Sequence, residues 1–174
     1  MLYLSQKRKE MDFAKKEMMA LVGGCTSEGT KILVPENLKD EFKKITITSF
    51  DIHTEDNDNG YDLIIEESPS DIIKVYEKLN DKGIYITTLD SFTDRDFLAS
   101  LSKLYWIVMP YFYLDNLVAK PLVFASKKFH PTADIIRHRS DFVEGTKYYT
   151  TDVHISSFTL PKYIFDEIKD VIRL

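Results

Sequence analysis

One short run, Tyr61–Ile65 (YDLII), constrains the fold more than any other part of the chain. Nearly all of its residues are apolar or aromatic, so a strand here must have both of its faces covered. The polar segment His53–Gly60 precedes the run, and Ser68–Asp71 follows it with residues that start helices. A buried strand that leads directly into a helix predicts an α/β fold, with helices packed on a sheet.

Strand and helix patterns alternate along the rest of the chain. We expect a first helix over Gln6–Val22, which Gly23 and Gly24 end. The other predicted strands are Lys31–Val34, Ile45–Ile52, Gly83–Thr88, Tyr105–Met109 and Pro121–Ser126, and the other predicted helices are Asn37–Lys43, Asp71–Asn80 and Thr93–Lys103. No helix pattern separates the last two strands, so we expect them to pair antiparallel, as in the closing hairpin of methyltransferase-like Rossmann folds. The prediction is a Rossmann-like, mostly parallel sheet in a single domain over residues 1–174.

The composition narrows the classes of partner. Hydrophobic residues make up 44% of the chain and charged residues 29%, the net charge is −5, and the basic clusters are short, so we expect no nucleic-acid partner. No apolar run approaches the roughly 20 residues of a membrane-spanning helix, and the N-terminus turns polar too early for a secretory signal. Cys25 is the only cysteine, so no disulfide forms within the chain, which favours a reducing cytoplasm.

A motif near the C-terminus, Lys147–Pro161 (KYYTTDVHISSFTLP), resembles the C-terminal signature of spermidine synthases (polyamine aminopropyltransferases), which usually reads RYYNxxIHxAAFxLP. Two weaker similarities occur in the family's order, Lys15–Leu21 (KKEMMAL) with YHEMLAH and Tyr61–Ser68 (YDLIIEES) with YDVIIVDS. We therefore expect a divergent and truncated bacterial member of this family. The resemblance also leads us to expect that the family's N-terminal β-domain is missing and that the segment before Tyr61 is shorter by about one strand–helix unit of ~30 residues.

The resemblance implies transfer of an aminopropyl group from decarboxylated S-adenosylmethionine to putrescine. In the family a GGGDGG loop after the first strand lets the backbone approach this donor closely. This chain has Pro35-Glu36-Asn37-Leu38 at that place, where proline fixes the backbone and the following side chains crowd the approach. We expect donor binding to be lost and predict no cofactor. The alternative is that the segment is only a strand-to-helix turn.

The resemblance also implies site residues. The family's proposed base falls on Glu67, with Ser68 and Asp71 as substrate-binding residues, and a carboxylate at the carboxyl end of a strand lies where open α/β sheets bind ligands. The alternative is that these three residues only form the entry to a helix. The family's acidic ribose-binding residue follows the second strand and corresponds to Asp51 or Glu55, and the alternative for both is a solvated loop.

An aromatic run follows Pro110, where the family lines its diamine groove. Phe112 and Tyr113 could hold an alkylammonium ion by cation–π interaction, or they could belong to a core or interface cluster. Lys15 and Lys16 replace uncharged or weakly basic residues of the family's YHEM motif, and two cations near a diamine would repel it.

Three functions remain open. The chain is a degenerate homologue without aminopropyltransferase activity, an active aminopropyltransferase with an altered donor site, or a non-catalytic binding module. The missing glycine loop favours the first. No metal-binding spacing occurs in the sequence, so we expect no metal site. The expected partners are a small amine or nucleoside ligand and, by resemblance, a second copy of the chain in a homodimer.

Overall fold

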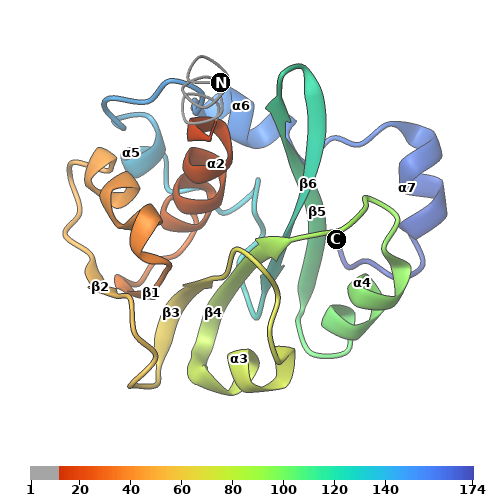
Figure 1. The fold of residues 1–174 in the computed structure, drawn as a ribbon, viewed down its shortest axis with the longest axis horizontal. Helices are drawn as coiled ribbons and strands as arrows, with labels where there is room; N and C mark the ends of the chain where they lie inside the picture. Colours follow the sequence, from red (N-terminus) through yellow and green to blue (C-terminus); the bar gives the residue numbers. More distant parts are fainter. Residues whose placement is uncertain (1–11) are drawn as a thin grey trace, which may run out of the picture.

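A six-stranded sheet forms the centre of the fold in the computed structural model, which describes residues 12–174 (Figure 1). The strands are β1 (Lys31–Leu33), β2 (Asp51–His53), β3 (Tyr61–Ile65), β4 (Leu79–Thr88), β5 (Ile107–Asp115) and β6 (Val118–Ser126), and their order in the sheet is β2-β1-β3-β4-β6-β5. Strand β6 runs antiparallel to its neighbours β4 and β5, and all other neighbours are parallel. This confirms the predicted mostly parallel sheet with an antiparallel closing hairpin.

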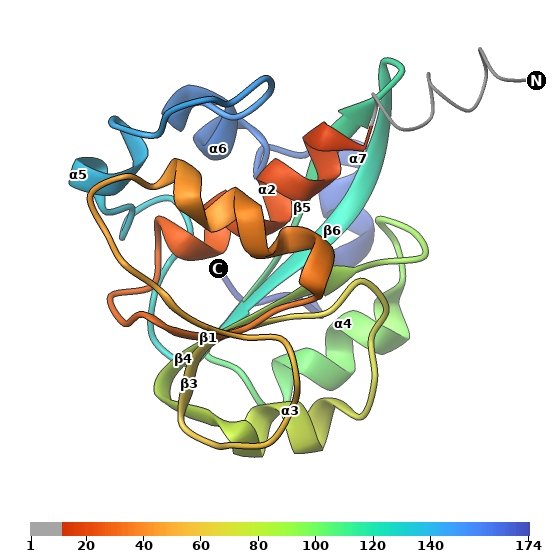
Figure 2. The same cartoon turned by 60° about the vertical axis from the view of Figure 1, so that its left-hand side comes forward.

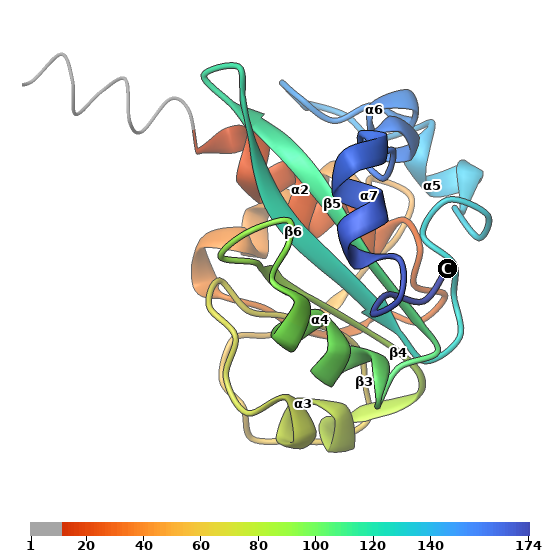
Figure 3. The ribbon, with the colours of Figure 1, turned by 90° about the vertical axis from the view of Figure 1, so that its right-hand side faces the viewer.

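Helices cover both faces of the sheet, as Figures 2 and 3 show. They are α2 (Phe13–Gly24), the 3-10 helix η1 (Glu36–Lys44), α3 (Ile72–Lys78), α4 (Arg95–Ser102), α5 (Arg137–Ser140), α6 (Thr151–Ser156) and α7 (Lys162–Ile168). Residues of α2 and η1 belong to the hydrophobic core on one face, and residues of α3, α4 and α7 to the core on the other. Within residues 12–174 no helix is both long and apolar enough to cross a bilayer.

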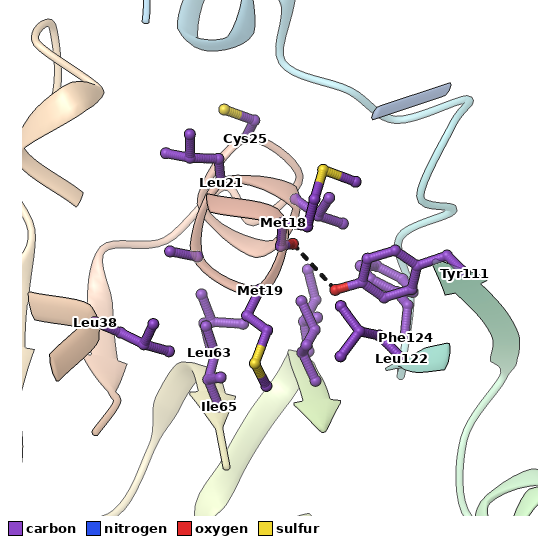
Figure 4. Close-up of a cluster of buried hydrophobic side chains, with 14 of the residues drawn as sticks. Met18, Met19, Leu21, Cys25, Leu38, Leu63, Ile65, Tyr111, Leu122 and Phe124 are labelled. Atoms are coloured by element: carbon purple, nitrogen blue, oxygen red, sulfur yellow. Dashed lines mark hydrogen bonds between the residues drawn. The ribbon is translucent and has the colours of Figure 1, made fainter. Parts of the chain in front are cut away.

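The first core lies between α2 and the sheet. Figure 4 shows Met18 and Met19 of α2 above the side chains of Leu63 and Ile65, all of them fully or almost fully buried. The hydroxyl of Tyr111 on β5 donates a hydrogen bond of 3.1 Å to the carbonyl of Met18, which ties the helix to the hairpin. Burial raises the pKa of Tyr111, so the hydroxyl stays a donor.

The second core lies beneath α3 and α4. Ile64 of β3 points here while its neighbours Leu63 and Ile65 point to the first core, as the alternation of side chains along a strand requires. The run YDLII is therefore buried on both faces, as its composition predicts. The rings of Tyr85 and Tyr105 stack in this core with centroids 6.4 Å apart.

The two glycines that the sequence assigns to a helix end are the last two residues of α2. A β-carbon on Gly23 would lie 2.8 Å from the methyl groups of Leu63, and one on Gly24 would lie 2.7 Å from a methyl group of Ile45. The helix ends at Gly24, as predicted to within two residues, and both glycines also let α2 pack closely against buried side chains. The predicted start of this helix, residues 6–11, lies outside the described residues.

The predicted strand Ile45–Ile52 is also wrong over most of its length. Ile45 makes only an isolated bridge with Val143, and the strand β2 begins at Asp51. The apolar residues alternate for another reason. Ile45 is buried in the first core, and the ring of Phe50 packs edge-on against that of Phe42 with the centroids 5.2 Å apart. Ile47, the apolar residue between them, is 44% exposed. A loop that buries two separated side chains, here Ile45 and Phe50, produces the same alternation of apolar and polar residues as a half-buried strand.

Candidate functional site

A cavity of about 560 Å³ opens at the carboxyl ends of β1, β2 and β3, beside α3. Open α/β sheets bind their ligands in the crevice outside the carboxyl ends of the parallel strands. Apolar side chains of Leu33, Ile64 and Val75 are part of its lining. Its charged lining residues are Asp56, Glu66, Glu67, Asp71, Lys74 and Lys78, so four carboxylates face two ammonium groups.

Glu67, the expected base, lines this cavity but is tied to the segment after β1. Its Oε1 accepts a hydrogen bond of 2.6 Å from the side-chain amide of Asn37, and its main-chain carbonyl accepts one of 2.9 Å from the hydroxyl of Thr88. The side chain is exposed. Glu67 is therefore near the cavity with one carboxylate oxygen already paired.

Ser68 and Asp71, the expected substrate-binding residues, also line the cavity. Asp71 caps helix α3, because its Oδ1 accepts hydrogen bonds from the backbone N–H groups of Ile73 at 3.1 Å and Lys74 at 3.3 Å. The helix-entry role that the sequence left open for Asp71 is thus present in the structure.

Glu66 is a cavity residue that the sequence analysis did not single out. It is half-buried, and its Oε1 accepts hydrogen bonds from the hydroxyl of Tyr85 at 2.7 Å and from the backbone N–H of Ser70 at 3.4 Å. Burial and the hydrogen bond to Glu66 raise the pKa of Tyr85, so this phenol remains protonated and donates. The sequence could have indicated this position of Glu66. Side chains two residues apart on a strand point to the same face, so Glu66 lies on the same face as Ile64, which is the face that α3 covers.

The acidic residue of the β2 segment that reaches the cavity is Asp56, which forms an ion pair with Lys78 of α3. Asp51 opens β2 rather than following it, with its Oδ2 3.1 Å from Nε2 of His53. Glu55 is exposed in the loop after β2. Neither Asp51 nor Glu55 lines this cavity, although they were the expected ribose-binding residues.

Phe112 and Tyr113, the expected diamine-binding residues, lie on β5, which β4 and β6 separate from β3. Neither lines the cavity beside α3. Both are half-buried, and burial together with the nearby acidic groups raises the pKa of Tyr113. The structure therefore does not bring these aromatic residues together with Glu67 around that cavity.

The connection from β1 to η1 is short. Leu33 ends the strand, Pro35 takes φ −59° and ψ 148°, and η1 begins at Glu36. The backbone N–H of Leu38 donates to the carbonyl of Pro35 at 3.0 Å, which closes the turn. This is the strand-to-helix turn that the sequence offered as the alternative to a donor loop. Among residues 12–174, no group of three or more His, Cys, Asp or Glu side chains is arranged to hold a metal ion.

Comparison with known proteins shows similarity to one group of enzymes. No family model matches it. The polyamine aminopropyltransferase of Helicobacter acinonychis is 29% identical over 122 residues, which cover 65% of this chain and 47% of that protein. The enzyme of the same name from Bacillus cytotoxicus is 24% identical over 182 residues, which cover 92% of this chain and 60% of that protein. These similarities support a divergent member of the spermidine synthase family.

Solved structures support the same fold. The crystal structure of spermidine synthase from Thermotoga maritima matches with a TM-score of 0.74 at 20% identity, over 92% of this chain and 76% of that one. A spermidine synthase in complex with the transition-state analogue AdoDATO matches equally well, over 77% of its length. This spermidine-synthase-like chain spans about half the length of the Helicobacter relatives that it matches.

The two sequence segments that most resemble the family meet in the structure. Glu17, from the segment KKEMMAL, is fully buried in α2 and accepts hydrogen bonds from the backbone N–H groups of Lys147, Tyr148 and Tyr149 at 2.7–2.8 Å. Further along the same motif, the hydroxyl of Tyr149 lies 2.7 Å from Nδ1 of His154, and both side chains are buried. In this spermidine-synthase-like chain the signature packs the C-terminal segment against α2.

Proposed function

We propose that this chain is a spermidine-synthase-like protein that has lost binding of decarboxylated S-adenosylmethionine and does not transfer aminopropyl groups. The observation that carries the proposal is the turn from β1 into η1 through Pro35, where the resemblance leads us to expect a glycine loop. Because proline has no N–H and the helix begins one residue later, few backbone donors are available to a nucleoside there.

The state of Glu67 supports the same proposal. Aminopropyl transfer needs a group that takes a proton from the attacking amine, and that group must be free to reach the nitrogen. The amide of Asn37 holds one oxygen of Glu67 at 2.6 Å. Asn37, which belongs to the segment that stands in place of the glycine loop, thus binds Glu67, the expected base.

Titration calorimetry and an assay for spermidine formation test the proposal. We expect no saturable binding of methylthioadenosine or of decarboxylated S-adenosylmethionine, and no spermidine from putrescine, under conditions where the Thermotoga maritima spermidine synthase serves as a positive control. Micromolar nucleoside binding would overturn the proposed loss of the donor site, and spermidine formation would overturn the proposed loss of activity.

A second candidate is an active aminopropyltransferase with an altered donor site. The open cavity favours it, because about 560 Å³ is within the range of ligand pockets and Glu67 lies at its rim. The spermidine assay decides between the candidates: activity that disappears in Glu67→Gln would establish the second.

Location and assembly are parts of the same proposal. We expect the protein in the cytoplasm and as a homodimer, from its cysteine content and from the resemblance. Light scattering coupled to gel filtration gives the mass in solution, and a monomer across the accessible concentration range would refute the dimer.

A further inference from the structure

The tip of the β5–β6 hairpin projects beyond the neighbouring helices α2 and α6 (Figures 1 and 3). Asp115 pairs with Val118, so only Asn116 and Leu117 form the turn between the strands. Both have a positive φ, 49° and 65°, as a type I′ turn requires. Glycine suits the second position, whereas a leucine is strained there. Leu117 is also 91% exposed, so in a single chain it provides neither a relaxed turn nor buried surface.

An apolar groove of about 350 Å³ lies directly beside Leu117. Its lining joins the start of α2, the hairpin and the C-terminal motif, and consists of Phe13, Ala14, Leu114, Asn116, Leu117 and Tyr148. Val118, which is 55% exposed, extends the apolar surface along the hairpin. We call this groove together with Leu117 and Val118 the hairpin patch. It has a projecting apolar side chain and an apolar recess next to each other.

Two opposite charges accompany the hairpin patch. Val118 lies opposite Asp115 on the paired strands, and Lys120 lies opposite Tyr113. These four side chains therefore share one face of the hairpin. Among residues 12–174, neither Asp115 nor Lys120 has an ion-pair partner. An anionic lipid surface would attract Lys120 and repel Asp115, whereas a surface with one charge of each sign is complementary to a copy of itself.

We propose that the hairpin patch is an interface between two copies of this chain. Leu117 of each copy enters the groove of the other, and Asp115 of each copy faces Lys120 of the other. A surface that carries both a projection and a recess satisfies both when two copies meet about a two-fold axis, and the assembly then closes as a dimer. The inference rests on the homodimer of the proposed function and names the surface that forms it.

The contact is made by side chains rather than by pairing of strand edges. On the outer edge of β5, the backbone N–H groups of Phe112 and Leu114 already donate to Ser157 and Tyr148 of the same chain. A second copy therefore finds few free donors with which to continue the sheet. The apolar groove and the charges remain as the features that it can bind.

Analytical ultracentrifugation of the full chain tests the interface. We expect a monomer–dimer equilibrium for the wild type and, for Leu117→Gly, a dissociation constant at least about tenfold higher, because the projecting side chain is removed. Glycine accepts the positive φ without strain, so this variant should keep the wild-type fold, which circular dichroism checks. Ile73 of α3 is 58% exposed, so Ile73→Ala is the matched control and should change the constant by less than about twofold.

Charge reversal separates contacts between copies from effects within one chain. Asp115→Lys and Lys120→Asp should each weaken the dimer at least about tenfold, because like charges then face each other across the two-fold axis. When the two variants are mixed, opposite charges face each other again, so a heterodimer should form with an affinity within about threefold of the wild type. An effect within one chain is not rescued by mixing, so a mixture that stays monomeric would overturn the inference.

The remaining outcomes distinguish this surface from the dimer itself and from other occupants. A wild type that stays monomeric would overturn both the inference and the proposed homodimer, whereas a dimer that Leu117→Gly does not weaken would overturn only the choice of surface. Two further results would overturn the inference: binding of a monomer through Leu117 to vesicles of phosphatidylcholine and phosphatidylserine, or nuclear Overhauser contacts in a monomer between Leu117 and residues 1–11. Spermidine formation is measured separately and decides only the proposed loss of activity.

Discussion

At the scale of single residues, Glu17 joins the two separate segments of the sequence that resemble spermidine synthases. Its carboxylate is fully buried and receives three backbone N–H groups from Lys147, Tyr148 and Tyr149. Nζ of Lys44 lies 3.3 Å from the same carboxylate. A buried charge is tolerated only with such compensation, so the helix residue and the C-terminal motif depend on each other.

Replacing Glu17 by Gln should destabilise the fold. A carboxamide has one acceptor oxygen, so at least one of the three backbone N–H groups loses its partner in the interior, and Lys44 keeps only Glu41 as a counter-charge. We expect the free energy of unfolding to fall by about 3 kcal/mol, measured by urea denaturation. The exposed pair of Glu28 and Lys82 gives the control, because Glu28→Gln should cost less than about 0.5 kcal/mol. Equal effects of the two changes would contradict the assignment.

His154 should make the stability depend on pH. Burial lowers the pKa of His154 to about 4, although a hydrogen bond to the carbonyl of Pro131 acts in the opposite direction. Between about pH 6.5 and pH 4 the unfolded chain therefore binds more protons at this site than the folded chain does. The stabilisation is present above pH 6.5 and is lost as the pH falls towards 4, and it amounts to about 3 kcal/mol.

The difference between two unfolding series isolates this group. The free energy of unfolding is measured from pH 7 to pH 4 for the wild type and for His154→Gln, and the variant should lose the added acid sensitivity. His138 is exposed, so His138→Gln is the matched control and should follow the wild-type curve. A His154→Gln curve parallel to the wild type would refute the assignment.

The sequence predicts where the candidate site lies, but it does not predict which side chains contact one another there. The position of Glu67 after a buried strand predicts a carboxylate at the ligand-binding edge, and the structure has a cavity there. The partners of that carboxylate are not visible in the sequence, because Asn37 and Glu67 are thirty residues apart and meet only through the sheet. Asp56 reaches the cavity in place of Asp51 or Glu55 because β2 begins six residues later than the pattern suggests.

At the scale of elements, the free edge of β5 is protected. The backbone N–H groups that point away from β6 have other partners: Val108 pairs with Arg173, Phe112 donates to the carbonyl of Ser157, and Leu114 donates to the hydroxyl of Tyr148 at 2.9 Å. Pro110, between them, has no N–H to offer. An edge strand without unpaired donors is a poor template for another chain.

Tyr148→Phe should remove the hydrogen-bond partner of one backbone N–H group on the free edge of β5, that of Leu114. Without the phenolic hydroxyl, the N–H of Leu114 has only solvent as a partner, so its hydrogen exchange should accelerate and the free energy of unfolding should fall by about 1 kcal/mol. Tyr163 is 70% exposed, so Tyr163→Phe is the control and should leave both quantities unchanged. Unaltered exchange at Leu114 in Tyr148→Phe would show that the hydroxyl does not protect it.

The elements that are predicted correctly are those whose sequence pattern depends only on neighbouring residues. The strand β3 and the cap of α3 by Asp71 are predicted correctly, because burial on both faces and helix capping depend on a few adjacent residues. The end of α2 at Gly24 is also predicted to within two residues, but the contacts of Gly23 and Gly24 with Leu63 and Ile45 are not, because these residues are distant in sequence. Glycine alone does not distinguish a helix end from a close approach between elements.

At the scale of the whole molecule, the two hydrophobic cores share one sheet. Adjacent residues of β3 face opposite cores, and the same holds for β4, where Tyr85 lies between Ile84 and Ile86. Loss of β3 or β4 would therefore disrupt both cores. The buried Glu17 adds a link between α2 and the C-terminal motif, which are about 130 residues apart in the chain.

This arrangement predicts that the chain unfolds as one cooperative unit, in agreement with the single domain expected from the sequence. Far-ultraviolet circular dichroism reports the helices. Buried tyrosines lie in both cores, Tyr111 and Tyr149 in the first and Tyr61, Tyr85 and Tyr105 in the second, so the near-ultraviolet signal reports the packing of both. The two transitions in urea should coincide. In Glu17→Gln both transitions should move together to lower urea, because the two cores still share β3 and β4. Two separated transitions in the wild type, or a variant in which only one signal moves, would show that the α2 face and the α3 face are independent units.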